Sequence, residues 1–180
     1  MVRLVLLLVL LGAAIAIVRS LVRGQAERRV QRQLDDLRAT FLHGQRPDRS
    51  SAAGLRRHRF GGLSFELPAT WEVEGQGELL TFRVGAIGDG RLQVLQRNER
   101  EPAGDPSTST EELPDGRRLI RRLVAVGEER VQYAWWLRST DGHRSVSFLL
   151  ESTRTEAVEA FRQADVATID WSAREARFDG

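Results

Sequence analysis

The longest apolar run of the chain stands at its N-terminus. Leu4 to Val18 contains no polar side chain, and Leu21 and Val22 extend the run if Arg19 and Ser20 are tolerated. A helix that spans a bilayer needs about 20 apolar residues, with roughly 17 as a lower limit. The pattern favours a retained transmembrane anchor over residues 1–22. A cleaved signal peptide is the alternative, because Arg3 precedes the run and residues 14–16 (AIA) resemble a cleavage site.

Arginines flank this run unequally, and the imbalance predicts an orientation. The residues expected to flank the membrane are Arg3, Arg19, Arg23, Arg28, Arg29 and Arg32. Most of them follow the run, and positive charge tends to stay on the cytoplasmic side. We therefore expect a single-pass protein of the cell (inner) membrane with its domain in the cytosol. A periplasmic or other extracytoplasmic domain is the alternative.

A helical pattern follows over residues 23–43. Val30, Leu34, Leu37 and Phe41 are spaced by 4, 3 and 4 residues, which places them on one helix face. This face is expected either to pack on the protein's own domain or on the membrane, or to associate with a second copy. Residues 44–58 are rich in Arg, Ser and Gly and predict a linker.

The period changes to two from residue 59 onward, which predicts strands. Leu63, Phe65 and Leu67 alternate before Pro68, and RRLIRRLVAV, RVQYAWWLRST and HRSVSFLLES read as an antiparallel meander. Thr153 and Glu156 form a helix-capping signature ahead of Phe161. The expected fold class is α+β. It comprises a transmembrane helix, an amphipathic helix, and a domain over 59–172 with five to seven antiparallel strands and a C-terminal helix, then a polar tail over 173–180.

The opening of this domain, with Leu67, Pro68 and Trp71 in the order apolar strand, proline and tryptophan, resembles the PsbP/DcrB/Mog1-like group of small α/β/α sandwiches. The similarity covers about residues 59–172. It implies a non-enzymatic binding or accessory domain, often extracytoplasmic, which conflicts with the charge-based orientation. Such proteins carry a helix between the two halves of the sheet, and only STSTEEL is placed to supply one here.

Charge divides the chain into two parts. All 27 basic side chains are arginine, so the high isoelectric point reflects arginine's pKa more than an excess of positive charge. Residues 1–58 carry a net charge of +7 and residues 59–180 carry −5. An acidic body argues against nucleic-acid binding, whereas a basic arm suits an anionic membrane surface. No cysteine is present.

The sequence offers no constellation typical of catalysis. His43, His58 and His143 are not at metal-ligand spacing, and GAIGDG precedes a strand rather than the helix that a dinucleotide site needs. No nucleophile lies near a base in a known motif. We therefore expect no enzyme activity, no cofactor and no bound metal.

The segment VQYAWWLRS has unusual content. On a strand, Val131, Tyr133, Trp135 and Leu137 share a core face, which leaves Trp136 on the more polar face. Trp136 is expected to pack under the C-terminal helix or the linker, or to serve as an exposed aromatic anchor. In the second case, a binding patch would comprise Trp136, Arg138, Arg144 and Arg122, with Arg121 as the alternative to Arg122.

These features predict a membrane-tethered, non-catalytic binding or accessory domain. Its expected partners are the lipid bilayer and a protein or small ligand. A structural or oligomerising membrane protein that uses the 24–43 helix is the first alternative, and a small enzyme is the second.

Overall fold

A computed structural model of the chain describes residues 24–25, 27–43, 54–84, 90–96, 108–126, 129–153 and 160–179. The predicted anchor over residues 1–22 and its Arg3, Arg19 and Arg23 flanks lie outside these segments. So do residues 44–53 of the predicted linker and the 85–89 connection. Within the described segments, no helix combines the length and the apolar character that a bilayer crossing requires.

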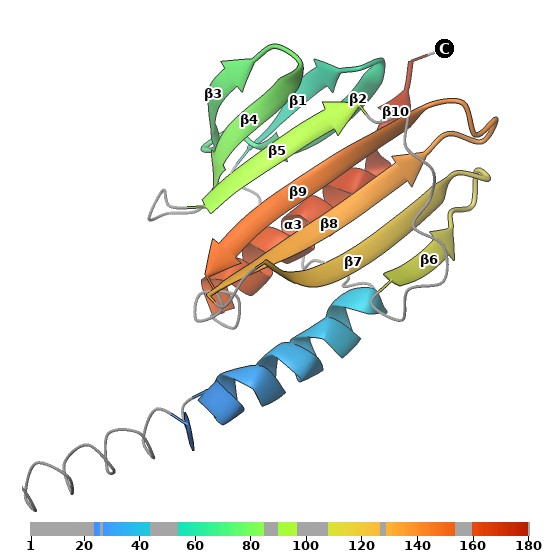
Figure 1. The fold of residues 1–180 in the computed structure, drawn as a ribbon. Helices are drawn as coiled ribbons and strands as arrows, with labels where there is room; N and C mark the ends of the chain where they lie inside the picture. The colour runs from blue at the N-terminus through green and yellow to red at the C-terminus, as the bar shows by residue number, and fades with distance from the viewer. Residues whose placement is uncertain are drawn as a thin grey trace, which may run out of the picture.

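Antiparallel strands dominate the described chain (Figure 1). The larger sheet has seven strands in the spatial order β3 (Glu72–Gln76), β4 (Leu79–Val84), β5 (Gly90–Gln96), β9 (Ser145–Thr153), β8 (Arg130–Arg138), β7 (Arg118–Val126) and β6 (Thr108–Glu112). The smaller sheet has the order β1 (Leu55–Phe60), β2 (Leu63–Pro68) and β10 (Arg177–Phe178). Two helices accompany them: α3 (Ala160–Glu175) and a helix over residues 27–42, here called the N-terminal helix.

The fold-class prediction is therefore wrong in two respects. The described chain is mainly β, with two sheets of three and seven strands in place of one sheet of five to seven. The helix that the structure describes near the N-terminus is the amphipathic one, and it packs into the core instead of crossing a bilayer. The transmembrane and single-pass expectations find no support in the described residues. The meander of β7, β8 and β9 is confirmed, since each strand pairs antiparallel with the next.

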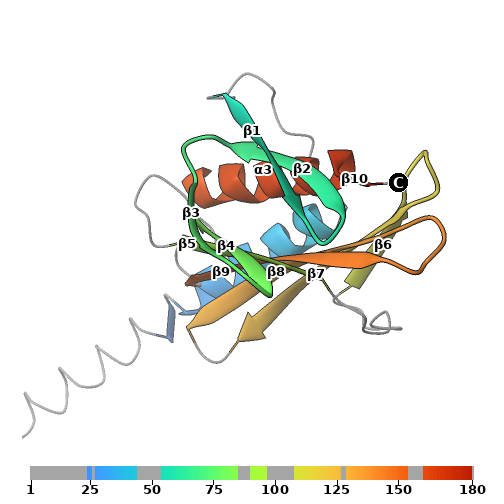
Figure 2. The ribbon, with the colours of Figure 1, turned by 90° about the horizontal axis from the view of Figure 1, so that it is seen from above.

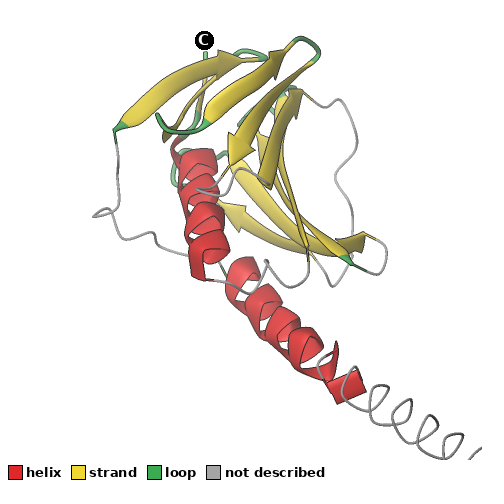
Figure 3. Cartoon of the chain, turned by 90° about the vertical axis from the view of Figure 1, so that its left-hand side faces the viewer, coloured by secondary structure: helices red, strands yellow, loops and turns green. Residues whose placement is uncertain are grey.

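One face of the large sheet carries both helices and the small sheet (Figures 2 and 3). Phe65 of β2 meets Phe148 of β9 edge to face, with ring centroids 5.3 Å apart. Phe41 of the N-terminal helix stands edge to face against Tyr133 and Trp135 of β8, at 5.4 and 5.2 Å. Aromatic pairs of this kind add to the free energy gained by burial. The covered face, here called the inner face, therefore holds one continuous core.

The amphipathic stripe of the N-terminal helix forms part of that core. Leu34, Leu37 and Phe41 are buried, and Val30 packs against the same cluster. The hydroxyl of Ser109 on β6 donates to the carbonyl of Leu42, 2.5 Å away, and so satisfies one orphan acceptor at the end of the helix. The residues predicted as a helix-association face thus pack against the protein's own sheet.

Several boundaries differ from the predicted ones. Strand β1 begins at Leu55, inside the predicted linker, and the predicted polar tail contains the end of α3 and all of β10. Within the predicted STSTEEL helix, residues TSTEE form strand β6, and the apolar end VATIDW belongs to α3. Thr153, the expected helix cap, is the last residue of β9. For β6 the tertiary partner is β7, whose pairing overrides the local preference.

Candidate functional site

Strand register decides where the predicted arginine–tryptophan patch lies. Ile120, Trp136 and Ser147 are directly opposed across β7, β8 and β9. Their shared face, here called the outer face, is the one that no described helix or strand covers (Figure 1). Trp136 is half-buried there, so α3 on the inner face does not cover it. The expectation that Trp136 packs under the C-terminal helix is wrong.

Three members of the patch share the outer face, and the fourth does not. Arg122 and Arg138 lie on it with Trp136, and both are half-buried. The Nε of Arg138 donates to the carbonyl of Gly142 in the adjoining turn, 3.1 Å away. Arg144 instead lies over the ring of Phe178 on β10, with 5.2 Å from its Cζ to the ring centroid. The predicted patch therefore splits, and its role as a partner anchor stays a prediction.

Three of the predicted membrane-flanking arginines lie on the N-terminal helix. Arg28, Arg29 and Arg32 are exposed there. Their exposure follows from the helix period, because the buried stripe occupies the opposite side.

The inner face carries a buried network of charged side chains. Asp170 of α3 accepts from Nε of Arg121 at 2.5 Å, from the indole nitrogen of Trp135 at 3.0 Å and from Nε of Arg174 at 2.9 Å. Arg121 and Arg174 also pair with Glu111 of β6, at 2.8 and 2.5 Å. Burial acts to raise the pKa of Glu111, but these two guanidinium groups outweigh it and lower that pKa.. The network joins α3 to β6, β7 and β8. Each of its charged groups forms an ion pair with another member of the network.

His58 is the histidine with an unusual environment. It lies in β1, where its ring stacks on Phe65 at 5.8 Å and meets Phe82 edge-on at 4.8 Å. Its Nε2 is buried without a hydrogen-bond partner in the described part of the chain. Burial, together with the charge of Arg56, lowers the pKa of His58. These aromatic surroundings suit a neutral ring. Among the residues that the structure describes, no cluster of side chains could hold a metal ion.

We expect His58 to make stability fall as the pH drops below about 6.5. An unfolded histidine has a pKa of about 6.5, so below that pH the unfolded chain binds a proton that the folded chain resists. The contribution of His58 is therefore complete above the unfolded pKa and is lost as the pH falls. Urea unfolding at pH 5.5, 6.5 and 7.5 measures it.

His58→Phe should flatten this profile, because phenylalanine fits the same aromatic surroundings without titrating. His143→Gln is the control, since His143 is exposed and its removal should leave the slope unchanged. An unchanged slope in His58→Phe would show that another group titrates.

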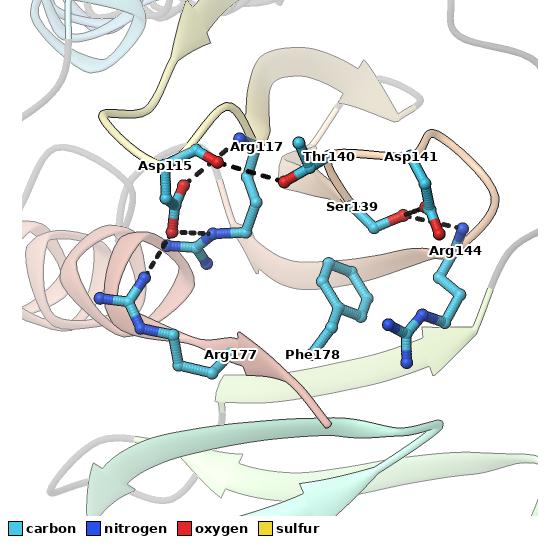
Figure 4. A pocket seen from close by; sticks show the side chains of 8 residues that line it. All are labelled: Asp115, Arg117, Ser139, Thr140, Asp141, Arg144, Arg177 and Phe178. Atoms are coloured by element: carbon cyan, nitrogen blue, oxygen red, sulfur yellow. Dashed lines mark hydrogen bonds and ion pairs between the residues drawn. The ribbon is translucent and has the colours of Figure 1, made fainter. Parts of the chain in front are cut away.

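An open pocket of about 310 Å³ lies at one end of the large sheet, beside the small sheet (Figure 4). Three segments that are far apart in the sequence line it: the β6–β7 turn, the β8–β9 turn and β10. Its lining residues are Asp115, Arg117, Ser139, Thr140, Asp141, Arg144, Arg177 and Phe178. The lining is mostly polar and charged, with Phe178 as its one aromatic side chain.

Two tight turns fix the walls of the pocket. Gly116 and Gly142 adopt positive φ angles of 82° and 72°, a conformation that favours glycine. The hydroxyl of Thr140 donates to the carbonyl of Asp115 at 3.2 Å and so ties one turn to the other. Asp141 Oδ1 accepts from the hydroxyl of Ser139 and from the backbone N–H of His143. The polar groups of the pocket are thus preorganised.

Arg117 holds the C-terminal segment against the first turn. Its buried guanidinium donates to the carbonyls of Ala176 and Arg174 and to Asp115. Asp115 also pairs with Arg177 at 2.6 Å. Burial acts to raise the pKa of Asp115, but the hydrogen bonds and charges of Arg117 and Arg177 lower it. Two guanidinium groups therefore share one carboxylate, and the cluster keeps a net charge of +1.

Arg144 is different, because no described carboxylate lies within ion-pair distance of its guanidinium. Its Nη1 donates to the carbonyl of Asp179 at 2.5 Å, and its face covers Phe178. A half-buried guanidinium held by a ring and a neutral carbonyl keeps its charge and most of its donors. Arg144 therefore has the capacity to bind an anion that enters the pocket.

Sequence reasoning missed most of this pocket. Arg144 was assigned to the other face of the sheet, and Arg177 and Phe178 were placed in a polar tail. The Asp–Gly pairs at 115–116 and 141–142 signalled turns, but no local pattern shows that two turns and the C-terminal strand meet.

A scan against protein-family models and a search of curated proteins both found no match to this chain. The similarity to PsbP/DcrB/Mog1-like domains therefore stays a prediction.

Proposed function

We propose that this protein is a non-catalytic binding domain whose end-of-sheet pocket holds a small ligand that bears a carboxylate group. The observation that carries the proposal is Arg144. Its guanidinium lines the pocket, is oriented by Phe178 and the Asp179 carbonyl, and has no carboxylate partner in the described chain. Hydrogen bonds between a guanidinium and a carboxylate are among the strongest that a protein forms.

The other features of the pocket also fit a binding site. Its carboxylates are held by hydrogen bonds from arginine, serine and backbone groups, so their positions are fixed before a ligand arrives. Phe178 adds an apolar surface beside the charge, which suits a ligand that carries a carboxylate on a hydrophobic body.

Titration with 3-phenylpropionate tests the proposal, followed by the amide resonances of the ¹⁵N-labelled protein. We expect saturable shifts confined to residues 139–144 and 176–179. Arg144→Gln should weaken binding about tenfold or more, because it removes a charge-assisted pair. The ligand's own spectrum should be unchanged after a day with the protein.

Arg59→Gln is the matched control, because Arg59 is an exposed arginine of β1 that does not line the pocket. It should bind like the wild type. Equal affinity in the wild type and Arg144→Gln would overturn the proposal, as would the lack of saturable shifts with every carboxylate ligand tested here and in the next subsection.

A further inference from the structure

The pocket offers a negative group as well as a positive one. Asp141 lines it three residues before Arg144, in the same turn. Both of the hydrogen bonds that Asp141 accepts go to Oδ1. Its Oδ2 has no hydrogen-bond partner in the described chain, and the residue is exposed. A donor on a ligand can therefore reach Oδ2 without breaking an existing contact.

Asp141 is a carboxylate, not a carboxylic acid, at neutral pH. The hydrogen bonds from Ser139 and from the His143 backbone lower its pKa, and the positive charge of Arg144 acts in the same direction. A ligand that carries only negative charge meets this carboxylate when it approaches Arg144. Like charges in one pocket oppose binding, whereas an ammonium group on the ligand turns the repulsion into attraction.

Pocket size limits the ligand further. About 310 Å³ is at the lower end of the roughly 300–1,000 Å³ that small-molecule sites occupy. The ring of Phe178, partly covered by Arg144, supplies one apolar wall. An amino acid or a dipeptide with a hydrophobic side chain has a suitable size and places both charges at one end or along one edge.

We infer that the ligand is a zwitterion of amino-acid or dipeptide size, with its carboxylate on Arg144 and its ammonium on Asp141. This inference rests on the proposed function, because it presupposes that Arg144 binds the ligand's carboxylate. It adds the second charge, the size class and the residue that distinguishes zwitterions from simple acids.

Pairs of ligands that differ only in the ammonium group test it. Phenylalanine and glycyl-phenylalanine are each compared with their N-acetylated forms, which keep the carboxylate and the ring but lose the positive charge. We expect at least one free zwitterion to bind about tenfold more tightly than its acetylated form. Equal affinities within both pairs would overturn the inference, and because only the ligand changes, this outcome does not depend on how a variant folds.

Asp141→Asn tests whether the charge of Asp141 is responsible for the preference. Asparagine keeps an oxygen acceptor for Ser139 and the His143 N–H but removes the charge. It should abolish the preference for the free zwitterion and leave the affinity for the acetylated form unchanged or higher. Equal weakening of both forms would contradict the role given to Asp141.

The two proposals fail separately. If 3-phenylpropionate binds in an Arg144-dependent manner while acetylation has no effect, the zwitterion inference fails and the anion-binding function stands. If neither 3-phenylpropionate nor any of the four phenylalanine compounds produces saturable shifts, both fail.

Discussion

Asp170→Ala is expected to lower the free energy of unfolding by about 3–5 kcal/mol, the range measured when one partner of a buried ion pair is removed. Asp170 and Arg121 are each only 1% exposed, so alanine would leave the Arg121 guanidinium buried with Glu111 as its remaining carboxylate. The indole nitrogen of Trp135 would also lose its acceptor. Urea unfolding followed by tryptophan fluorescence and circular dichroism measures the loss.

Two further variants separate the effect of the unpaired Arg121 guanidinium from other effects of the substitution. Asp36→Ala, on the exposed side of the N-terminal helix, should change stability by no more than about 0.5 kcal/mol. Adding Arg121→Met to Asp170→Ala should recover part of the loss, because the uncompensated charge is then gone. A loss below about 1 kcal/mol in Asp170→Ala would show that water reaches the network.

Phe41→Ala should cost about 3–5 kcal/mol of unfolding free energy, the usual range for removing a buried aromatic ring. The side chain is 1% exposed and stands edge-on to both Tyr133 and Trp135. Its loss opens a cavity between the N-terminal helix and β8 and removes two aromatic contacts. Urea unfolding measures the cost, and sedimentation of the same samples should show an unchanged oligomeric state.

Arg32→Ala is the control on the same helix, because Arg32 is exposed and alanine is a good helix former. It should leave stability nearly unchanged. The opposite pattern for Phe41→Ala, a stable variant with altered sedimentation, would mean that this face joins copies of the chain instead of packing on β8.

Local periodicity was sufficient for the elements whose burial pattern is regular. The 4–3–4 spacing of Val30, Leu34, Leu37 and Phe41 predicted the N-terminal helix, and alternation over residues 118–153 predicted three antiparallel strands. The alternation also placed Trp135 in the core and Trp136 on the other face, because successive strand residues point to opposite sides.

Local pattern failed where a distant partner decides the conformation. Strand β6 has no apolar alternation and forms because β7 offers it a ladder of hydrogen bonds. Strand β10 has two residues and exists only through Ser64 and Leu63 of β2. Arg121 and Asp170 are 49 positions apart, so no window of sequence relates their charges.

The sequence by itself determined the amphipathic helix, the meander, the lack of lysine and cysteine, and the division into basic and acidic parts. The tertiary structure alone decided that the helix stripe is core, that buried ion pairs join α3 to the large sheet, and that two turns and the C-terminal strand line an open pocket. The physical reason is the distance along the chain over which each kind of interaction acts. Periodicity and turn chemistry act over a few residues, whereas a pocket and a buried ion pair are made by contacts between segments that the chain brings together only when it folds.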